Sequence, residues 1–262
     1  MPRHVTAPDG VRLAVEVGGR GPALVMVHGA GSARWGFELV RPLLEPRFTV
    51  WELDRRGRGD SQDGDGYSLE REFDDVAAVV RAAGDGAFLF GHSYGGLLAA
   101  GAAGLLEGLQ RLVLYEPPMG GVLADEAWVR RFEAGLANGE RREAVRGFLH
   151  DVGGYSHVEI DAMEGTPAWE RRLVVAPTVP RELRAERALS SDGLRLDQLD
   201  LACLLLVGSR SPDWARRSTE AFAAAIPGAE VRTLQGHGHG AALSGPGVLA
   251  AELEGFLLAA PP

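Results

Sequence analysis

The sequence contains no lysine: all 27 basic side chains among its 262 residues are arginines. Schiff-base catalysis, attachment of pyridoxal phosphate and the usual phosphate-binding loop all require a lysine amine and are therefore excluded. The single cysteine, Cys203, excludes an intrachain disulfide. Its position in the apolar run ACLLLV predicts a buried core residue rather than a nucleophile.

Long hydrophobic runs are also absent. The longest, residues 97–106, is far shorter than the roughly 20 residues needed to cross a bilayer. The first ten residues, MPRHVTAPDG, hold no apolar signal segment. The formal charge of -9 is spread along the chain and repels both nucleic acid and anionic lipid. We therefore expect a cytoplasmic protein that binds a small-molecule substrate and requires no nucleic acid, membrane or cofactor; its oligomeric state is not indicated.

Short apolar β-forming runs alternate with helical patterns along most of the chain. The expected strands are residues 11–17, 23–28, 48–54, 86–91, 111–116, 202–208 and 230–234. The expected helices between them are residues 35–45, 68–83, 94–108, 214–226 and 246–259. Most of the strands are continuously apolar, as strands covered on both faces are. This alternation predicts an α/β fold with a mostly parallel, doubly wound sheet.

One long segment interrupts the alternation. Its expected helices are residues 125–137, 140–151, 157–164, 167–175 and 180–188. A segment of this length is not a structureless loop in a compact domain. We predict that residues 1–116 and 201–262 form the core and that residues 117–200 form a helical lid inserted between strands.

The motif GHSYGG, residues 91–96, follows one apolar strand and opens a helix. A serine in G-x-S-x-G at such a junction is held on a strained turn, and the flanking glycines prevent collisions between strand and helix. Ser93 is therefore the candidate nucleophile. Among the seven histidines, His237 and His239 follow the last strand, whose loop returns to the strand ends where Ser93 lies. No cysteine or closely following carboxylate accompanies this pair, so no metal site is expected.

The chain resembles the α/β-hydrolase-fold superfamily, of the serine hydrolase type, over nearly its full length. The motifs that carry the resemblance are VHGAG (27–31), LDRRGRGDS (53–61), GHSYGG (91–96), YEPP (115–118), LLLVGSRSP (204–212) and LQGHGHGAALSGP (234–246). In this family the catalytic base lies in a G-x-G-H stretch about seven residues before a proline. The resemblance therefore implies that His239, before Pro246, is the base.

The resemblance also implies an oxyanion hole made by the backbone amides of Tyr94 and Ala30. Two fixed donors of this kind stabilise a tetrahedral intermediate by several kcal/mol. Gly29 would let the main chain approach a ligand closely, and His28 would act as a structural hydrogen bonder. Trp35 is a further candidate for the wall of the pocket.

The acid of the triad departs from the family pattern. Family members usually carry an aspartate three residues after the glycine that ends LLLVG, where this chain has Ser211. Two replacements are available: Glu116, at the end of the strand RLVLYE, and Asp213 in SPDW. We favour Glu116 because some members of the fold take their acid from this strand, and because the following Pro117 and Pro118 would hold it rigidly.

The expected activity is hydrolysis of an ester, thioester or lactone of a small to medium apolar acyl substrate. Ser93 would form an acyl-enzyme, His239 would transfer the proton, and Glu116 would orient the imidazole. The same site could instead serve acyl transfer, cyclisation or perhydrolysis. A non-catalytic protein that binds a small molecule is the remaining alternative.

Overall fold

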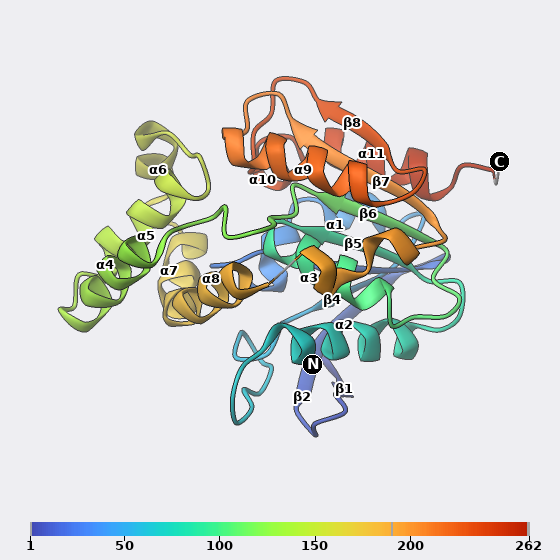
Figure 1. Ribbon diagram of the computed structural model, residues 1–262, viewed down its shortest axis with the longest axis horizontal. Helices are drawn as coiled ribbons and strands as arrows, with labels where there is room; N and C mark the ends of the chain where they lie inside the picture. The colour runs from blue at the N-terminus through green and yellow to red at the C-terminus, as the bar shows by residue number, and fades with distance from the viewer. Residues whose placement is uncertain (1, 190, 261–262) are drawn as a thin grey trace.

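An eight-stranded sheet forms the centre of the computed structural model, which describes residues 2–189 and 191–260 (Figure 1). The strands are β1 (Arg3–Thr6), β2 (Arg12–Gly19), β3 (Ala23–Val27), β4 (Thr49–Leu53), β5 (Phe88–His92), β6 (Arg111–Tyr115), β7 (Ala202–Gly208) and β8 (Glu230–Leu234). Their spatial order is β1-β2-β4-β3-β5-β6-β7-β8. β2 pairs antiparallel with both β1 and β4, and every other pair of neighbouring strands is parallel. The predicted mostly parallel sheet is confirmed.

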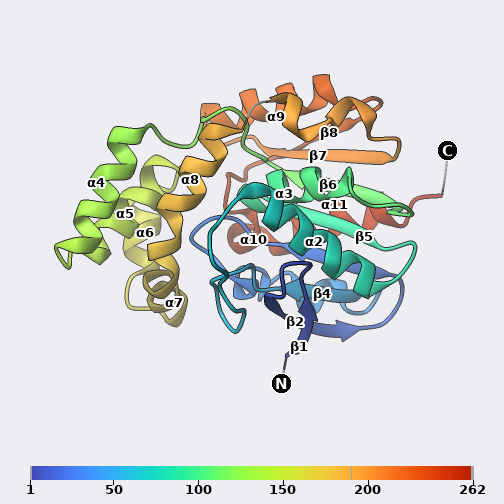
Figure 2. The ribbon, with the colours of Figure 1, turned by 60° about the horizontal axis from the view of Figure 1, so that its bottom comes forward.

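Helices cover both faces of the sheet (Figure 2). They bury two separate apolar clusters, one on each face. One face carries α2 (Leu69–Ala83), α3 (Tyr94–Ala103) and α9 (Asp213–Ala225). The other carries η1 (Arg34–Phe37), α1 (Arg41–Leu44), α10 (Ala241–Ser244) and α11 (Pro246–Leu257). This is the doubly wound arrangement that the alternating sequence pattern predicts.

The central strands carry apolar residues on both faces because both faces are covered. In β6, Leu112 and Leu114 belong to one cluster, whereas Val113 and Tyr115 belong to the other. Cys203, in the neighbouring β7, is buried as predicted, and burial raises the pKa of its thiol to about 12. Such a thiol stays protonated at neutral pH and is a poor nucleophile.

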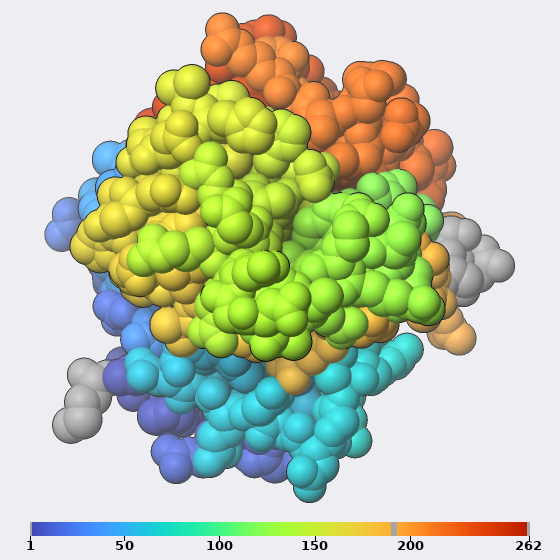
Figure 3. All heavy atoms as spheres, turned by 90° about the vertical axis from the view of Figure 1, so that its left-hand side faces the viewer, coloured from blue at the N-terminus to red at the C-terminus, as the bar shows by residue number. Residues whose placement is uncertain are grey.

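Five helices lie between β6 and β7, and Figures 1 and 3 show that they form a layer at one end of the molecule. They are α4 (Glu126–Ala137), α5 (Arg141–Asp151), α6 (His157–Met163), α7 (Pro167–Val175) and α8 (Val179–Ala188). Side chains of Asp125, Ser156 and Thr166 cap three of their N-termini, which explains why the sequence indicates their starts so clearly. Short 3-10 turns, η2 (Ala176–Thr178), η3 (Ser191–Leu194) and η4 (Leu196–Gln198), complete the segment. Its action as a lid remains a prediction.

The structure differs from the expected elements in a few places. The expected helix 35–45 is two short pieces, η1 and α1, because a continuous helix would press the ring of Pro42 against the carbonyl of Glu38. The helix expected over 94–108 ends at Ala103. The edge strand β1 was not predicted, since it is short and largely exposed and so lacks a buried face. Residues 1, 190 and 261–262, which fall within the predicted core and lid segments, lie outside the described residues. Among the residues that are described, no helix combines the length and apolarity required to cross a membrane.

Candidate active site

Ser93 lies on a strained turn between β5 and α3. Its φ of 55° is in the left-handed region, which a side chain other than glycine rarely adopts. A Cβ on Gly91 would come within 2.3 Å of the Gly95 carbonyl oxygen, and one on Gly95 within 2.2 Å of the Val27 carbonyl oxygen. Only glycine therefore fits at these two positions. The turn has the geometry of a nucleophile elbow.

Glu116 directly contacts His239. Its Oε2 accepts a hydrogen bond of 2.5 Å from Nδ1 of the imidazole. Oε1 accepts from the backbone N–H of Gly208, at 2.6 Å, and from the hydroxyl of Ser211. A carboxylate only accepts hydrogen bonds, so Nδ1 of His239 carries the proton and Nε2 is left as the basic nitrogen.

Glu116 shares an unusual backbone conformation with Ser93. The described residues other than glycine that have positive φ are Ser93, Glu116, at 48°, and Arg195. Backbone strain persists where the surrounding structure enforces it, and it clusters at functional sites. At Glu116 the surroundings include the paired strands β6 and β7, because its N–H donates to the carbonyl of Leu206.

Two aromatic residues next to Ser93 and Glu116 hold the loop that carries His239. Nε2 of His92 donates to the carbonyl of His239 at 2.9 Å, and the two rings lie 4.6 Å apart. The Tyr115 hydroxyl donates to the carbonyl of Gly238. Burial lowers the pKa of His92 well below its usual range, so this imidazole is neutral and acts as a fixed donor. His239 is thus positioned through both its backbone and its side chain.

The loop after β3 also lies close to Ser93. A Cβ on Gly29 would lie 3.0 Å from the Cβ of Ser93, so a larger residue would crowd the nucleophile. His28 accepts from the Arg55 N–H and donates to the Gly29 carbonyl, and burial lowers its pKa well below the usual range. It is a structural hydrogen bonder, as the resemblance implies.

The amides expected to form the oxyanion hole are free of protein acceptors. In residues 2–189 and 191–260, neither the N–H of Tyr94 nor that of Ala30 donates to a backbone or side-chain oxygen. The N–H of Tyr94 is also one of the unpaired donors of the first turn of α3, where the helix dipole favours negative charge.

Several residues of the candidate site line one cavity of about 70 Å³. Ser93, which is 6% exposed, and His239, which is 8% exposed, both line it. His28, Gly29 and Ala30 line the same cavity. Its remaining walls include Leu123, Phe148, Leu149, Tyr155 and Arg172 from the segment between β6 and β7.

Three residues considered from the sequence lie elsewhere. Asp213 is 83% exposed on its side chain and faces Arg217, so the structure brings Glu116 to the imidazole and leaves the alternative acid at the surface. Asp213 is also the first residue of α9, and Pro212 stands at the N-cap position without a capping hydrogen bond from its side chain. Trp35 does not line the cavity of Ser93, contrary to expectation, but a neighbouring one. His237 contacts Ser244 at 3.3 Å.

Comparison with known proteins decides the family. A sequence model of the alpha/beta hydrolase family matches residues 24–252. The chain belongs to this family. It is 30% identical to the pimeloyl-[acyl-carrier protein] methyl ester esterase of Stenotrophomonas maltophilia over 260 residues, covering 95% of this chain and 97% of the relative. A crystal structure of an alpha/beta hydrolase from Sphaerobacter thermophilus, 33% identical, covers 97% of this chain and 99% of that one with a TM-score of 0.81.

A further relative matches part of the alpha/beta hydrolase chain. The N-formylmaleamate deformylase of Pseudomonas putida is 42% identical over 110 residues, or 40% of each protein. Esterases and other hydrolases among the relatives make the protein a hydrolase. A Ser-His-acid triad and a two-amide oxyanion hole are typical of its family.

Several residues of this hydrolase site are not apparent from sequence motifs. Ser211 was considered only as the place of the missing acid, yet its hydroxyl binds Glu116. Tyr115 precedes Glu116 on a strand whose apolar pattern gives no sign of a polar role. Arg172 reaches the cavity from α7, far along the chain, and no local pattern distinguishes it from the other arginines.

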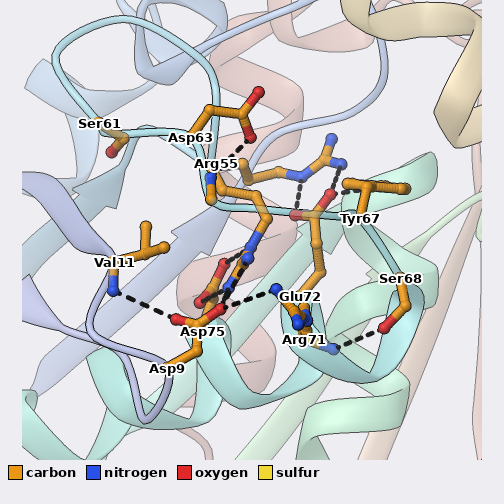
Figure 4. Close-up of polar contacts among 12 residues, drawn as sticks. Asp9, Val11, Arg55, Ser61, Asp63, Tyr67, Ser68, Arg71, Glu72 and Asp75 are labelled. Carbon is orange, nitrogen blue, oxygen red and sulfur yellow. Dashed lines mark hydrogen bonds and ion pairs between the residues drawn. The ribbon is translucent and has the colours of Figure 1, made fainter.

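A buried ionic network connects the core of the hydrolase to the helices over the site. Arg55 donates to both carboxylate oxygens of Glu72, at 2.8 and 2.5 Å, and Tyr67 donates to the same carboxylate (Figure 4). Glu182 of α8 accepts from both Arg55 and Arg58. All four charged side chains have no exposed surface. The network therefore fixes α8 to the loop after β4.

We expect Glu182→Gln to lower the free energy of unfolding by about 3–5 kcal/mol, because it removes the negative charge shared by two buried guanidinium groups. Urea unfolding followed by tryptophan fluorescence measures the change. Asp63→Asn is the matched control: Asp63 also bridges to α8, through Arg181 at 2.7 Å, but its side chain is 45% exposed. An exposed pair contributes about 0–1 kcal/mol. Equal losses in the two variants would contradict the assigned role of Glu182.

Proposed function

We propose that the protein hydrolyses carboxylic esters through an acyl-enzyme formed on Ser93. The observation that carries the proposal is the 2.5 Å hydrogen bond from His239 to Glu116 in the wall of the cavity that Ser93 also lines. A carboxylate in this place orients the imidazole and stabilises the imidazolium that forms when the serine is deprotonated. Its position at the end of β6 replaces the aspartate that the family usually carries at position 211.

The reaction begins with attack of the Ser93 hydroxyl oxygen on the ester carbonyl. Nε2 of His239 takes the hydroxyl proton, and the N–H groups of Tyr94 and Ala30 donate to the oxyanion. The tetrahedral intermediate then collapses, and the imidazolium returns the proton to the leaving alcohol. Water then attacks the acyl-enzyme as His239 takes one of its protons. The second tetrahedral intermediate collapses with cleavage of the acyl–Oγ bond, and the imidazolium returns its proton to Ser93, which releases the carboxylic acid.

The size and lining of the site support an ester with a small acyl group. The cavity at Ser93 is small, about 70 Å³, and Leu123, Phe148 and Leu149 contribute apolar surface to it. Ester chemistry is further supported by the relative from Stenotrophomonas maltophilia, which is named as a methyl ester esterase. Thioesters and lactones present the same carbonyl to the serine and are secondary candidates.

Turnover of short acyl esters tests the proposal. We expect p-nitrophenyl acetate and butyrate to be hydrolysed with a burst of p-nitrophenol, and intact-protein mass spectrometry after rapid quenching to detect an acetyl or butyryl adduct. The matching thioesters and p-nitroanilides measure the preference for oxygen esters. Hydrolysis of anilides but not of esters would contradict the proposed ester chemistry, and ester turnover without any adduct in rapidly quenched samples would contradict the acyl-enzyme.

A further inference from the structure

The guanidinium group of Arg172 lies in the wall of the site and has no counter-ion among the described residues. It lines the cavity of Ser93 and His239 and also a second cavity of about 440 Å³. In the described part of the chain, its side chain forms no ion pair, and its buried Nε has no hydrogen-bond partner. Its hydrogen bond to protein is a long one, 3.4 Å from Nη1 to the carbonyl of Gly31. Most of its five N–H donors are therefore available.

Other arginines show how this chain neutralises a buried guanidinium. Arg55, Arg56 and Arg58 each form an ion pair with at least one buried carboxylate. Arg171, the neighbour of Arg172 in sequence, contacts Glu38 at 2.8 Å. Both Arg171 and Arg172 lie 5.0 Å from the centre of the Trp35 ring, so an aromatic contact does not distinguish them. What distinguishes Arg172 is that it lines the cavity of Ser93, whose described lining holds no carboxylate, and forms no ion pair there. Of the two cavities that Arg172 lines, only the second has carboxylates, Glu38 and Glu159, in its described wall.

We propose that Arg172 binds a carboxylate of the substrate. The substrates are then esters that also carry one free carboxylate group close to the scissile ester bond. Arg172 is half-buried. Partial desolvation of a charge without a partner is unfavourable, and a ligand that supplies the opposite charge offsets that penalty. The planar guanidinium presents paired donors that match a carboxylate in a bidentate arrangement. This inference rests on the proposed ester hydrolysis and adds the class of substrate.

The place of Arg172 limits the distance between the two functional groups of the substrate. The carbonyl that Arg172 contacts belongs to Gly31, the residue after the proposed oxyanion donor Ala30. The cavity that contains Ser93 is also small. A carboxylate bound to Arg172 would therefore lie only a short spacer away from the ester carbonyl. The second cavity, which shares Gly36, Arg172, Ala242 and Leu243 with the first, offers a mostly apolar space for the remaining part of the substrate.

Matched charged and neutral esters test the inference. The acyl-side series consists of monomethyl and dimethyl esters of malonate, succinate, glutarate and adipate, and the alcohol-side pair consists of O-acetylglycolate and its methyl ester. For at least one spacer, Arg172→Met should lower the ratio of kcat/KM for the charged ester to that for the neutral ester by about tenfold to a hundredfold, chiefly through KM. Arg172→Lys should restore part of the ratio, and Arg171→Met, the matched control, should leave it unchanged. Equal losses for charged and neutral esters in Arg172→Met would show a purely structural role and overturn the inference.

Binding without turnover separates this inference from the proposed reaction. In Ser93→Ala, the dicarboxylate that matches the preferred spacer, or succinate and glutarate if no ester is hydrolysed, should raise the melting temperature. The shift should disappear in the double variant Ser93→Ala/Arg172→Met. Binding of this kind without ester hydrolysis by the wild type would contradict the proposed reaction and support the carboxylate site. Hydrolysis of neutral esters without any such shift would leave the reaction standing and overturn the site.

Discussion

Replacing Ser93 by alanine is expected to lower kcat for ester hydrolysis by about four to six orders of magnitude. The variant keeps the two amides proposed to bind the oxyanion and the imidazole but has no oxygen to form the acyl bond. Steady-state turnover of p-nitrophenyl butyrate measures the loss. The adduct found in rapidly quenched wild-type protein should be absent from the variant.

The same variant should remain folded. The Ser93 hydroxyl donates no hydrogen bond to a described side chain or backbone carbonyl. Removing this hydroxyl takes away one oxygen in the wall of a cavity. Alanine also tolerates the φ of 55° no worse than serine does. Thermal unfolding within a few degrees of the wild type would show that the loss is chemical. A variant that retains a tenth or more of the wild-type kcat would contradict the assignment of Ser93 as nucleophile.

Glu116→Gln is expected to lower kcat by about three to four orders of magnitude, because an amide stabilises the imidazolium poorly and can favour the wrong imidazole tautomer. Asp213→Asn is the matched control: it makes the same change of carboxylate to amide on the exposed alternative acid, and we expect kcat to stay within twofold. A large loss in the Asp213 variant with little loss in the Glu116 variant would reverse the assignment of the acid.

A rescue experiment sharpens this prediction. The Ser211 hydroxyl already contacts the carboxylate of Glu116, so a carboxylate introduced at position 211 starts next to the imidazole. Adding Ser211→Asp to Glu116→Gln should therefore raise kcat at least tenfold above that of the Glu116→Gln variant. The double variant should also show the pH profile of a Ser-His-acid enzyme. Failure of the rescue in a correctly folded protein would mean that Glu116 acts by more than supplying a negative charge near His239.

The parts of the site that depend on local sequence could be predicted, because a short segment contains the whole signal. The two glycines around Ser93 fix the turn, and their tight contacts are with backbone from the same turn and from the neighbouring β3. Helix starts were equally clear where a capping side chain such as Asp125 or Ser156 precedes the apolar pattern. Glu116 and His239 are 123 positions apart in the sequence. Their pairing could still be predicted, because parallel strands bring their carboxyl ends to one edge of the sheet.

The parts that depend on contacts between distant segments could not be predicted. Glu182 accepts from Arg55 across 127 positions, and nothing in the helical pattern of α8 marks it as a buried ion. Arg172 resembles its neighbour Arg171 in the sequence. Only the structure shows that Arg171 pairs with a carboxylate, whereas Arg172 forms no ion pair with any of the described residues. The structure places Trp35 in the wall of the second cavity rather than of the first, because its position after a glycine loop gives its approximate place but not the cavity that it lines.

The most direct test of the central claim, that Glu116 and His239 activate Ser93, is labelling with a fluorophosphonate followed by digestion and mass spectrometry. We expect one adduct, on the peptide that contains Ser93, with a labelling rate that falls by orders of magnitude in Glu116→Gln and is unchanged in Asp213→Asn. An unlabelled wild-type protein, or an adduct that persists in Ser93→Ala, would contradict the claim.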